Sequence, residues 1–259
     1  MDYETLKREA AKYPDTMTNI DDIYKSPCSP KRSARLPEFP GKEFLWTKSA
    51  FRVQWKKSDA ENCAENPFGV NFAMEQILGS VKKRIDQLLQ NRERIIVAIE
   101  GNCTAGKTTL ADALKKEYGC NVIRMDDFFL RPEQRTRQRY AQPGGNIDYE
   151  RFREEVLQPL TKGAAFSYRP FSCSTFTLAD PVELTPGKLT VVEGTYSLHP
   201  YFGDVYDLKV FLSVTPEVQT RRILERPPFL HRRFFEEWIP MERQYFDCFR
   251  VADQCDLLL

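Results

Sequence analysis

The sequence has no excess of charge of either sign. Its 259 residues include 38 Lys and Arg against 37 Asp and Glu, which gives a formal net charge of +1. Proteins that bind nucleic acid usually present a basic surface, so this balance predicts no nucleic-acid partner. Any site for an anion must therefore be a local arrangement of side chains.

Long apolar runs are also missing. No stretch approaches the roughly 20 apolar residues of a membrane span. The first residues, Met-Asp-Tyr-Glu-Thr, lack the basic and apolar regions of a signal peptide. The sequence therefore predicts no membrane partner and a cytoplasmic location. Its composition, with 41% hydrophobic and 29% charged residues, is typical of a soluble globular protein.

Metal-binding and disulfide patterns are absent too. The 7 cysteines include no C-x-x-C pair, so we expect reduced thiols rather than a zinc site or a disulfide framework. Histidine occurs only at His199 and His231, for which we expect loop or packing roles and no catalytic role. The length fits one large α/β domain, with or without an extension, and leaves the oligomeric state open.

Against this background one motif is prominent. Residues 101–108 read G-N-C-T-A-G-K-T and match the phosphate-binding loop G-x-x-x-x-G-K-[ST] at every fixed position. An apolar, β-branched run at 95–99 precedes it, and 109–116 have helical spacing, so the loop joins a buried strand to a helix. Lys107 would bridge the β- and γ-phosphates of a nucleoside triphosphate, and Thr108 would hold Mg²⁺. The predicted nucleotide-binding residues are Gly101, Asn102, Cys103, Thr104, Ala105, Gly106, Lys107, Thr108 and Thr109.

From residue 94 onward, predicted strands and helices alternate. This order predicts an α/β fold of the P-loop NTPase type over residues 91–259, with a doubly wound parallel sheet and helices on both faces. Residues 1–90 are expected to form an N-terminal extension with a Pro/Ser-rich basic linker, an aromatic segment that forms two short strands or a packing arm, and a packing helix over 72–89. A loop or flap is expected at 131–147. The expected strands are 95–99, 121–124, 189–192, 208–214 and 256–259.

Carboxylates follow two of these strands. Asp126 and Asp127 come after the strand at 121–124, and Glu193 follows the apolar run at 189–192. Such positions face the ligand crevice of an open α/β sheet. Phosphoryl transfer to a hydroxyl needs a carboxylate that accepts the proton, and Asp126 or Asp127 meets that need. Glu193 would bind Mg²⁺ directly or through water. The alternatives are a helix cap for the aspartates and a surface position for the glutamate.

A basic segment near the C-terminus reads Arg221-Arg222-Ile223-Leu224-Glu225-Arg226 and is followed by His231-Arg232-Arg233. On a helix and turn beside a phosphate loop, arginines can close over the transferring phosphoryl group and stabilise its charge, as a lid does. A solvated helix face is the alternative interpretation.

The order of these motifs resembles the uridine kinase and phosphoribulokinase group of P-loop kinases, which is similar to nicotinamide riboside kinases and type I pantothenate kinases. The resemblance covers about residues 94–259. It rests on the phosphate loop followed by Asp-Asp-Phe-Phe, Val-Val-Glu-Gly, Arg-Arg-Ile-Leu-Glu-Arg and Cys-Asp-Leu-Leu-Leu. It implies a kinase that uses ATP and Mg²⁺. The spelling Asp-Asp-Phe-Phe is closer to that of nicotinamide riboside kinases than to that of uridine kinases.

The resemblance assigns the catalytic and metal-binding roles to single residues. Asp126 corresponds to the family's base toward a sugar 5′-hydroxyl, and Glu193 corresponds to the glutamate near the metal. Arg222 and Arg226 fall where the lid arginines lie. Together with Lys107 they would neutralise the charge that develops during transfer.

The same resemblance implies an acceptor site. Asp148 matches an aspartate that hydrogen-bonds ribose hydroxyls, although Tyr-Glu follows it here in place of His-Pro. Tyr168 resembles a tyrosine that packs against a pyrimidine, and Arg222 would also face the substrate. Uridine-cytidine kinases have a base-reading histidine a few residues after that tyrosine, where this sequence has Cys173 or its neighbour. Residues 226–230 also replace a charged, glycine-bearing segment of that family. Both departures leave the identity of the base open.

Together these observations predict transfer of the γ-phosphoryl group of ATP to a primary hydroxyl of a small molecule, with a nucleoside such as uridine or cytidine as the expected acceptor. Nicotinamide riboside, pantothenate or another small alcohol stay open as acceptors. A P-loop ATPase or switch that acts with a macromolecular partner is an alternative from another class. A regulator without catalysis is disfavoured by the joint presence of Lys107, Thr108, Asp126 and Glu193.

Overall fold

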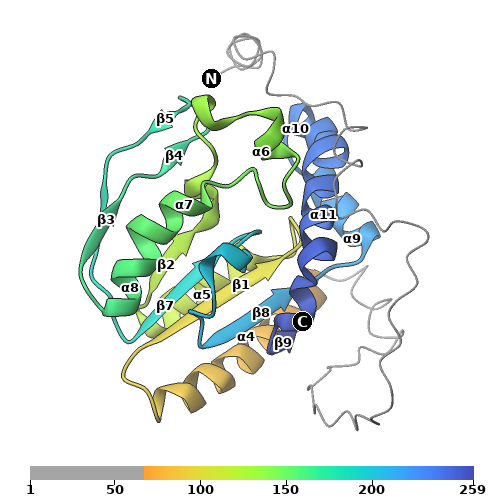
Figure 1. The fold of residues 1–259 in the computed structure, drawn as a ribbon. Coiled ribbons are helices and arrows are strands. Elements are labelled where there is room, and N and C mark those ends of the chain that lie inside the picture. The colour runs from red at the N-terminus through yellow and green to blue at the C-terminus, as the bar shows by residue number, and fades with distance from the viewer. Residues whose placement is uncertain (1–66) are drawn as a thin grey trace, which may run out of the picture.

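The fold is described for residues 67–259 of a computed structural model (Figure 1). The predicted basic linker and aromatic arm fall within residues 1–66 and lie outside this range. The predicted packing helix is present as α4, Pro67–Leu89, which begins earlier than expected. Within the described range, no helix combines the length and the apolar character that crossing a membrane requires.

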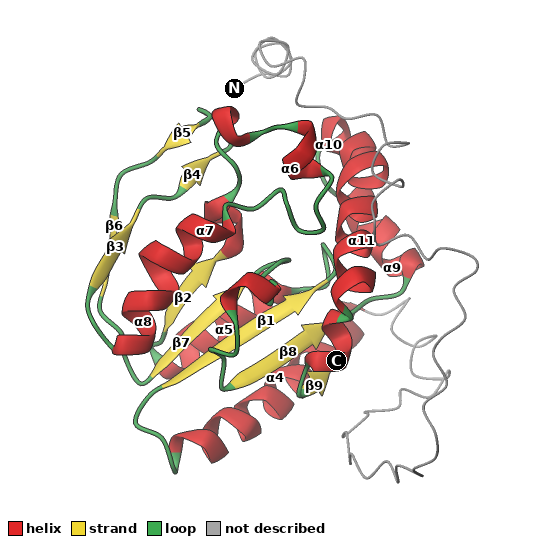
Figure 2. Cartoon of the chain, viewed as in Figure 1, coloured by secondary structure: helices red, strands yellow, loops and turns green. Residues whose placement is uncertain are grey.

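The centre of the fold is a five-stranded parallel sheet with the strand order β2-β7-β1-β8-β9 (Figure 2). β1 pairs with β7 on one side and with β8 on the other, so the loop that follows β1 opens at the middle of the sheet. All five predicted strands are present, and the last two are shorter than expected. Their bounds are Ile95–Gly101 for β1, Asn121–Arg124 for β2, Leu189–Glu193 for β7, Leu208–Leu212 for β8 and Leu257–Leu258 for β9.

Side chains of β1 alternate between two apolar layers, as burial on both faces of a parallel sheet requires. Val97 and Ile99 are fully buried in the layer formed with α4 and with α5, Lys107–Tyr118. Ala98 belongs to the other layer, together with Phe152 and Tyr245. Helices therefore cover both faces of the sheet, which confirms the predicted doubly wound α/β architecture.

Two longer helical stretches each contain one turn of π-helix. Pro159 and Pro240 follow these turns. Proline clashes with the carbonyl four residues before it and has no N–H, and the wider turn relieves that clash. The first stretch comprises α7 (Tyr149–Phe152), η4 (Arg153–Leu157) and α8 (Gln158–Lys162). The second comprises α10 (Pro228–Arg233), η6 (Phe234–Trp238) and α11 (Ile239–Phe249).

Segment 131–147, where a loop or flap was expected, contains two short helical elements. Pro132 begins one of them, and the Thr136 hydroxyl caps the other by accepting a hydrogen bond from Arg139 N, which stabilises helical turns locally. The short elements of the fold are η2 (Met125–Phe128), η3 (Pro132–Gln134), α6 (Arg137–Tyr140), η5 (Pro200–Phe202), α9 (Pro216–Leu224) and η7 (Val251–Gln254).

Two antiparallel ladders lie beyond α7 and α8, at the edge of the molecule (Figure 1). The strands β3, Phe166–Tyr168, and β6, Val182–Leu184, form one ladder. The strands β4, Phe171–Ser172, and β5, Thr177–Leu178, form the other. These strands could not be predicted from the sequence, because strands of two or three residues show no alternation of apolar and polar residues.

Candidate active site

The phosphate loop joins β1 to α5 at the carboxyl end of the central strand. Gly101 has a φ of 136°, and a Cβ there would lie 1.9 Å from the carbonyl oxygen of Leu212 on β8. Gly106 has a φ of 100° at the N-cap of α5. Both positions therefore require glycine. The first N–H groups of α5 have no partner within the helix and face outward as an anion-binding end.

Lys107 is buried at the start of α5, and all three donors of its ammonium group are engaged. Nζ donates to the carbonyl oxygens of Gly101 and Asn102, both at 2.7 Å, and to Thr195 Oγ1 at 3.1 Å. The ammonium is thus held inside the loop, where phosphate oxygens would compete for its donors. Thr195 is a partner that the sequence analysis does not predict.

Thr108 and Glu193 meet, as predicted from the sequence. Thr108 Oγ1 donates to Glu193 Oε1 at 3.0 Å, and an Arg124 guanidinium nitrogen lies 3.5 Å from the same oxygen. A hydroxyl and a carboxylate are hard oxygen ligands of the kind that Mg²⁺ prefers, with phosphate and water completing its shell. Among residues 67–259 no group of three or more His, Cys, Asp and Glu gathers as a metal cluster. The pair therefore fits Mg²⁺ bound together with a nucleotide.

Asp126 and Asp127 lie in η2, directly after β2, and their surroundings differ. Asp127 Oδ2 accepts a hydrogen bond from the Tyr168 hydroxyl at 3.3 Å. Asp126 is reached by solvent, and its carboxylate accepts no hydrogen bond from the described residues. Surrounding protein raises the pKa of Asp126 by limiting its hydration, while Lys107 and Arg124 act in the opposite direction. Asp126 is therefore the aspartate that is free to accept a proton from a ligand.

Helix α9 places two side chains on the phosphate loop. Arg222 Nη1 donates to the carbonyl oxygen of Thr104 at 2.7 Å, and Gln219 Nε2 donates to that of Cys103 at 3.2 Å. Arg226 lies beyond the last residue of α9, and its side chain is exposed. The two predicted lid arginines thus differ, because Arg222 contacts the loop and Arg226 faces solvent.

Glu242 of α11 also contacts the loop, and no motif in the sequence predicts it. Its Oε2 accepts a hydrogen bond from Cys103 N at 3.0 Å, and its Oε1 accepts one from the Thr195 hydroxyl at 3.4 Å. Burial raises the pKa of the Cys103 thiol to about 12, and Glu242 adds to the effect. The thiol is therefore protonated near neutral pH and has the packing role rather than a reactive one.

Glu100 is fully buried beneath the loop, and sequence analysis does not single it out. Its Oε1 accepts hydrogen bonds from the N–H groups of Gly101 at 3.1 Å and Tyr196 at 2.9 Å. Its Oε2 accepts from Leu198 N at 3.0 Å and from the Tyr245 hydroxyl at 3.1 Å. Burial raises the pKa of this carboxyl to about 7 in spite of these donors. The side chain joins the phosphate loop to the segment after β7 and to α11.

Asp148 is buried at the start of α7, where its side chain caps the helix. Its Oδ1 accepts a hydrogen bond from Arg151 N at 3.2 Å, and its Oδ2 accepts one from Gln134 Nε2 at 2.8 Å. Both oxygens are therefore engaged. An acceptor hydroxyl would have to replace Gln134 in order to bind this carboxylate.

Tyr168 lies on β3 with its side chain only 5% exposed. Its ring centroid is 5.2 Å from that of Phe128, and its hydroxyl donates to Asp127. The ring is thus covered by the protein. The contacts of Tyr168 hold Asp127 in place and leave no open face for a pyrimidine.

The two histidines have the packing and loop surroundings expected from the sequence. His199 stacks on Tyr149 with ring centroids 4.3 Å apart, and burial lowers its pKa to about 4. His231 lies in α10, and its Nε2 is 2.8 Å from the carbonyl oxygen of Arg226 in the turn before that helix. Neither imidazole contacts the phosphate loop.

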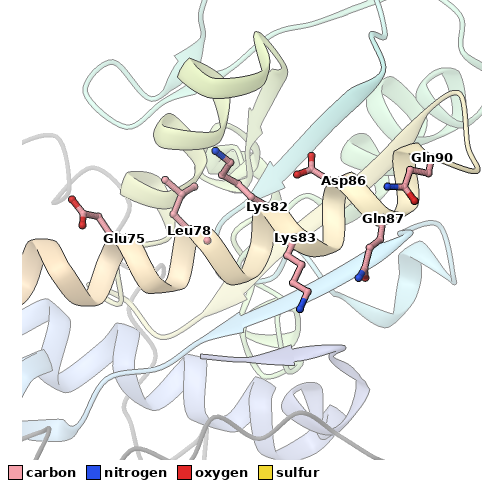
Figure 3. A pocket seen from close by; sticks show the side chains of 8 residues that line it. Glu75, Leu78, Lys82, Lys83, Asp86, Gln87 and Gln90 are labelled. Atoms are coloured by element: carbon pink, nitrogen blue, oxygen red, sulfur yellow. The ribbon is translucent and has the colours of Figure 1, made fainter.

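A shallow surface hollow runs along α4, and none of its lining residues belongs to the phosphate loop (Figure 3). Figure 3 shows Lys82 and Lys83 extending to opposite sides of the helix rather than toward a common point. Two polar groups are already engaged with α5, since Lys82 pairs with Glu117 and Asp86 accepts from the Tyr118 hydroxyl at 2.7 Å. We assign no ligand to this surface.

Two solved structures share this architecture, while no family model matches the sequence. A protein described as a possible uridine kinase of Bacillus stearothermophilus is 20% identical, and the match covers 70% of this chain and 99% of that chain with a TM-score of 0.52. A protein described as a fructose transport system kinase of Silicibacter sp. TM1040 is 21% identical, with 72% and 98% covered and a TM-score of 0.55. At these identities the likeness establishes the fold alone, a parallel α/β sheet with helices on both faces.

Proposed function

We propose that this protein is a phosphotransferase that moves the γ-phosphoryl group of ATP to a hydroxyl of a small-molecule alcohol. The observation that carries the proposal is the gathering of three parts at the carboxyl edge of the sheet. These parts are Lys107 inside the phosphate loop, the hydrogen-bonded pair Thr108 and Glu193, and the carboxylate of Asp126, which accepts no hydrogen bond from residues 67–259. Phosphoryl transfer needs a cation for the phosphates, a metal site and a group that orients the nucleophile.

Asp126 is the proposed proton acceptor. It would orient the alcohol oxygen toward the γ-phosphorus and take its proton as the new O–P bond forms and the bond to the ADP oxygen breaks. Its raised pKa brings it nearer to the working pH, where a general base is most effective. Asp127 is committed to Tyr168 and would support the geometry of η2.

The remaining groups would bind the phosphates and stabilise their negative charge. Lys107 and the first N–H groups of α5 would bind the phosphates, and Arg222 is already in place on the loop. Arg226 would join them when the segment after α9 moves over the nucleotide. Thr108 and Glu193 would hold Mg²⁺, which supplies positive charge on the phosphates when bound. A loose transition state asks mainly for positioning and charge, so no covalent intermediate is expected.

The acceptor is proposed as a class. A nucleoside such as uridine or cytidine follows from the sequence resemblance, and nicotinamide riboside and pantothenate are the alternatives. The contacts of Asp148 and Tyr168 support a nucleoside less than the sequence does, because Gln134 occupies the first and Phe128 covers the second. The geometry supports a small alcohol more broadly.

The test is ADP release from ATP and Mg²⁺ with purified protein against a panel of alcohols that includes uridine, cytidine, nicotinamide riboside and pantothenate. The wild type is expected to need an acceptor. Asp126→Asn should lower kcat at least ~10²-fold, while the adjacent Asp127→Asn is the matched control and should retain more activity. Equal loss in both variants would remove Asp126 as the specific base. Release that ignores every acceptor would instead support an ATPase or switch.

A further inference from the structure

Arg135 lies near Asp126 and forms no ion pair with an acidic side chain of residues 67–259. Arg135 follows η3, and its side chain is half-buried. Its Nε donates to the carbonyl oxygen of Leu130 at 3.0 Å. Within residues 67–259, neither of its two terminal nitrogens forms a hydrogen bond or an ion pair with another side chain. Because a guanidinium is always charged and carries five N–H donors, four donors of Arg135 remain available.

Two aromatic rings hold this guanidinium in place. Its carbon lies 5.4 Å from the ring centroid of Phe171 and 5.2 Å from that of Phe176. Phe171 is buried on β4, and the two rings meet edge to face with centroids 6.5 Å apart. Cation–π contacts of this kind orient the planar group without using its donors. The fork of Arg135 is therefore fixed before any ligand arrives.

The position of β4 places this fork beside the proposed reaction centre. β4 packs against η2, the element that carries Asp126. Cys173 follows β4, and its thiol is close enough to interact electrostatically with both Asp126 and Arg135. It also interacts with Arg233 at the end of α10. The carboxylate and the two arginines thus border the same region.

The neighbouring arginines are already committed. Arg131 donates to Gln134 Oε1 at 3.2 Å and pairs with Glu133 at 3.4 Å. Arg169 donates to two carbonyl oxygens at the β5 end of its hairpin, at 2.7 and 2.9 Å. These side chains stabilise the fold locally. Among these three arginines, Arg135 alone has terminal donors that bind no acceptor in the described part of the chain.

We propose that the alcohol substrate carries an anionic group, a phosphate or a carboxylate, and that Arg135 binds this group while the hydroxyl faces Asp126. The inference rests on the proposed function and defines its substrate class. A guanidinium binds either oxyanion through two parallel hydrogen bonds. The carboxylates of Asp126 and Asp127 repel the anion from the other end of the site. Attraction at one end and repulsion at the other fix the direction in which the substrate lies.

A binding experiment tests whether Arg135 binds an anion, without requiring catalytic turnover. Inorganic phosphate and acetate serve as probes, with Mg²⁺ and a non-hydrolysable ATP analogue at saturation so that the phosphate loop is filled. Melting temperature is followed against probe concentration. The wild type should show saturable stabilisation, and Arg135→Gln should weaken probe affinity at least ~10-fold. The stronger probe identifies the oxyanion that the substrate carries.

The control is Arg84→Gln, which removes the same charge from the exposed side of α4 in the opposite layer and should behave as the wild type. If Arg135→Gln fails to fold by circular dichroism, Arg135→Lys replaces it, because an ammonium keeps the charge and loses the two parallel bonds. Equal probe affinity in the wild type and the Arg135 variant would overturn the proposal. So would a wild type that neither probe stabilises.

A turnover experiment separates this inference from the proposed function. ADP release is measured with glycerol, glycerate and glycerol phosphate, which differ in the anionic group. The anionic members should have the higher kcat/KM, and Arg135→Gln should raise their KM at least ~10-fold and leave the KM for ATP unchanged. Release with glycerol alone, indifferent to Arg135→Gln, would refute the anion site and keep the kinase. Probe binding at Arg135 without release by any alcohol would refute the kinase and keep the anion site.

Discussion

Replacing Glu100 with glutamine tests how the phosphate loop is held from beneath. The variant keeps the shape of the side chain but exchanges one acceptor oxygen for an NH₂ group. The remaining oxygen would face the N–H groups of Gly101 and Tyr196, which can only donate. The new NH₂ group would then face the Tyr245 hydroxyl, which can rotate and accept a hydrogen bond instead of donating one. Leu198 N–H then meets a donor and loses its hydrogen bond. A buried N–H without a partner costs about 1–3 kcal/mol.

The pKa of Glu100 decides how the comparison changes with pH. Burial raises it from 4.5 to about 7, so the folded protein binds this proton more tightly than the unfolded chain. The stability that protonated Glu100 contributes is complete at a pH below 4.5, the pKa of the unfolded chain. It is lost as the pH rises to about 7, which lowers the free energy of unfolding by about 3 kcal/mol. Glutamine does not titrate. The difference in unfolding free energy between the two proteins should therefore move in the variant's favour by about 3 kcal/mol over this window.

Urea unfolding of both proteins from about pH 5 to about pH 8 measures this difference, and the subtraction removes every other titrating group. Glu183→Gln at an exposed position of β6 is the matched substitution and should stay within about 0.5 kcal/mol of the wild type throughout. A difference for Glu100→Gln that is flat with pH, or that moves in favour of the wild type as the pH rises, would show that the pKa of Glu100 is not raised in the folded protein.

Three further predictions concern activity. Thr195→Val removes the hydroxyl that holds Lys107 and should lower kcat/KM by about tenfold in steady-state assays; an unchanged value would show that the contact does not position the ammonium. Arg222→Ala removes the contact with Thr104 and should raise the KM for ATP by about tenfold, measured by nucleotide titration. Unaltered affinity would contradict its place on the loop. Asp126 must be ionised to act as a base, and its pKa is raised. As the pH is lowered, kcat should therefore begin to fall at a higher pH than the pKa of an ordinary aspartate would give. A pH profile of kcat without this decrease on the acidic side would contradict the assignment of Asp126.

The phosphate loop and the parallel strands could be predicted because their signals are local. The fixed glycines of 101–108 meet backbone demands at Gly101 and Gly106, and the apolar runs are buried on both faces of the sheet. Thr108 and Glu193 are far apart in the sequence. Their meeting followed from a general rule, since the carboxyl ends of parallel strands share one edge of the sheet.

The supporting contacts could not be predicted, because they join distant segments that no pattern links. Glu242 lies 139 positions from Cys103 and reaches it only because α11 packs beside the phosphate loop. Glu100 is a charge at the end of an apolar run, a signal that could have been noticed, but its donors come from the turn after β7 and from α11. Arg135 needed the short strand β4 to place Phe171 beneath it, and two-residue strands leave no readable pattern.

The contacts of the predicted acceptor-site residues could not be predicted from the sequence resemblance. A motif can place Asp148 and Tyr168 near the ligand region, but it does not contain the neighbours that occupy them. Gln134 reaches Asp148 from the segment expected to be a loop, and the core ring of Phe128 covers Tyr168. Acceptor choice depends on such individual contacts, which vary on a constant fold.

The most direct test of the central claim follows the γ-phosphoryl group itself. Purified protein is given ATP with a radiolabelled γ-phosphate, Mg²⁺ and a mixture of small alcohols with and without anionic groups, and the products are separated. We expect label in a phosphorylated alcohol with the wild type and none with Lys107→Ala. Label that appears only in inorganic phosphate, at a rate independent of the alcohols, would contradict it.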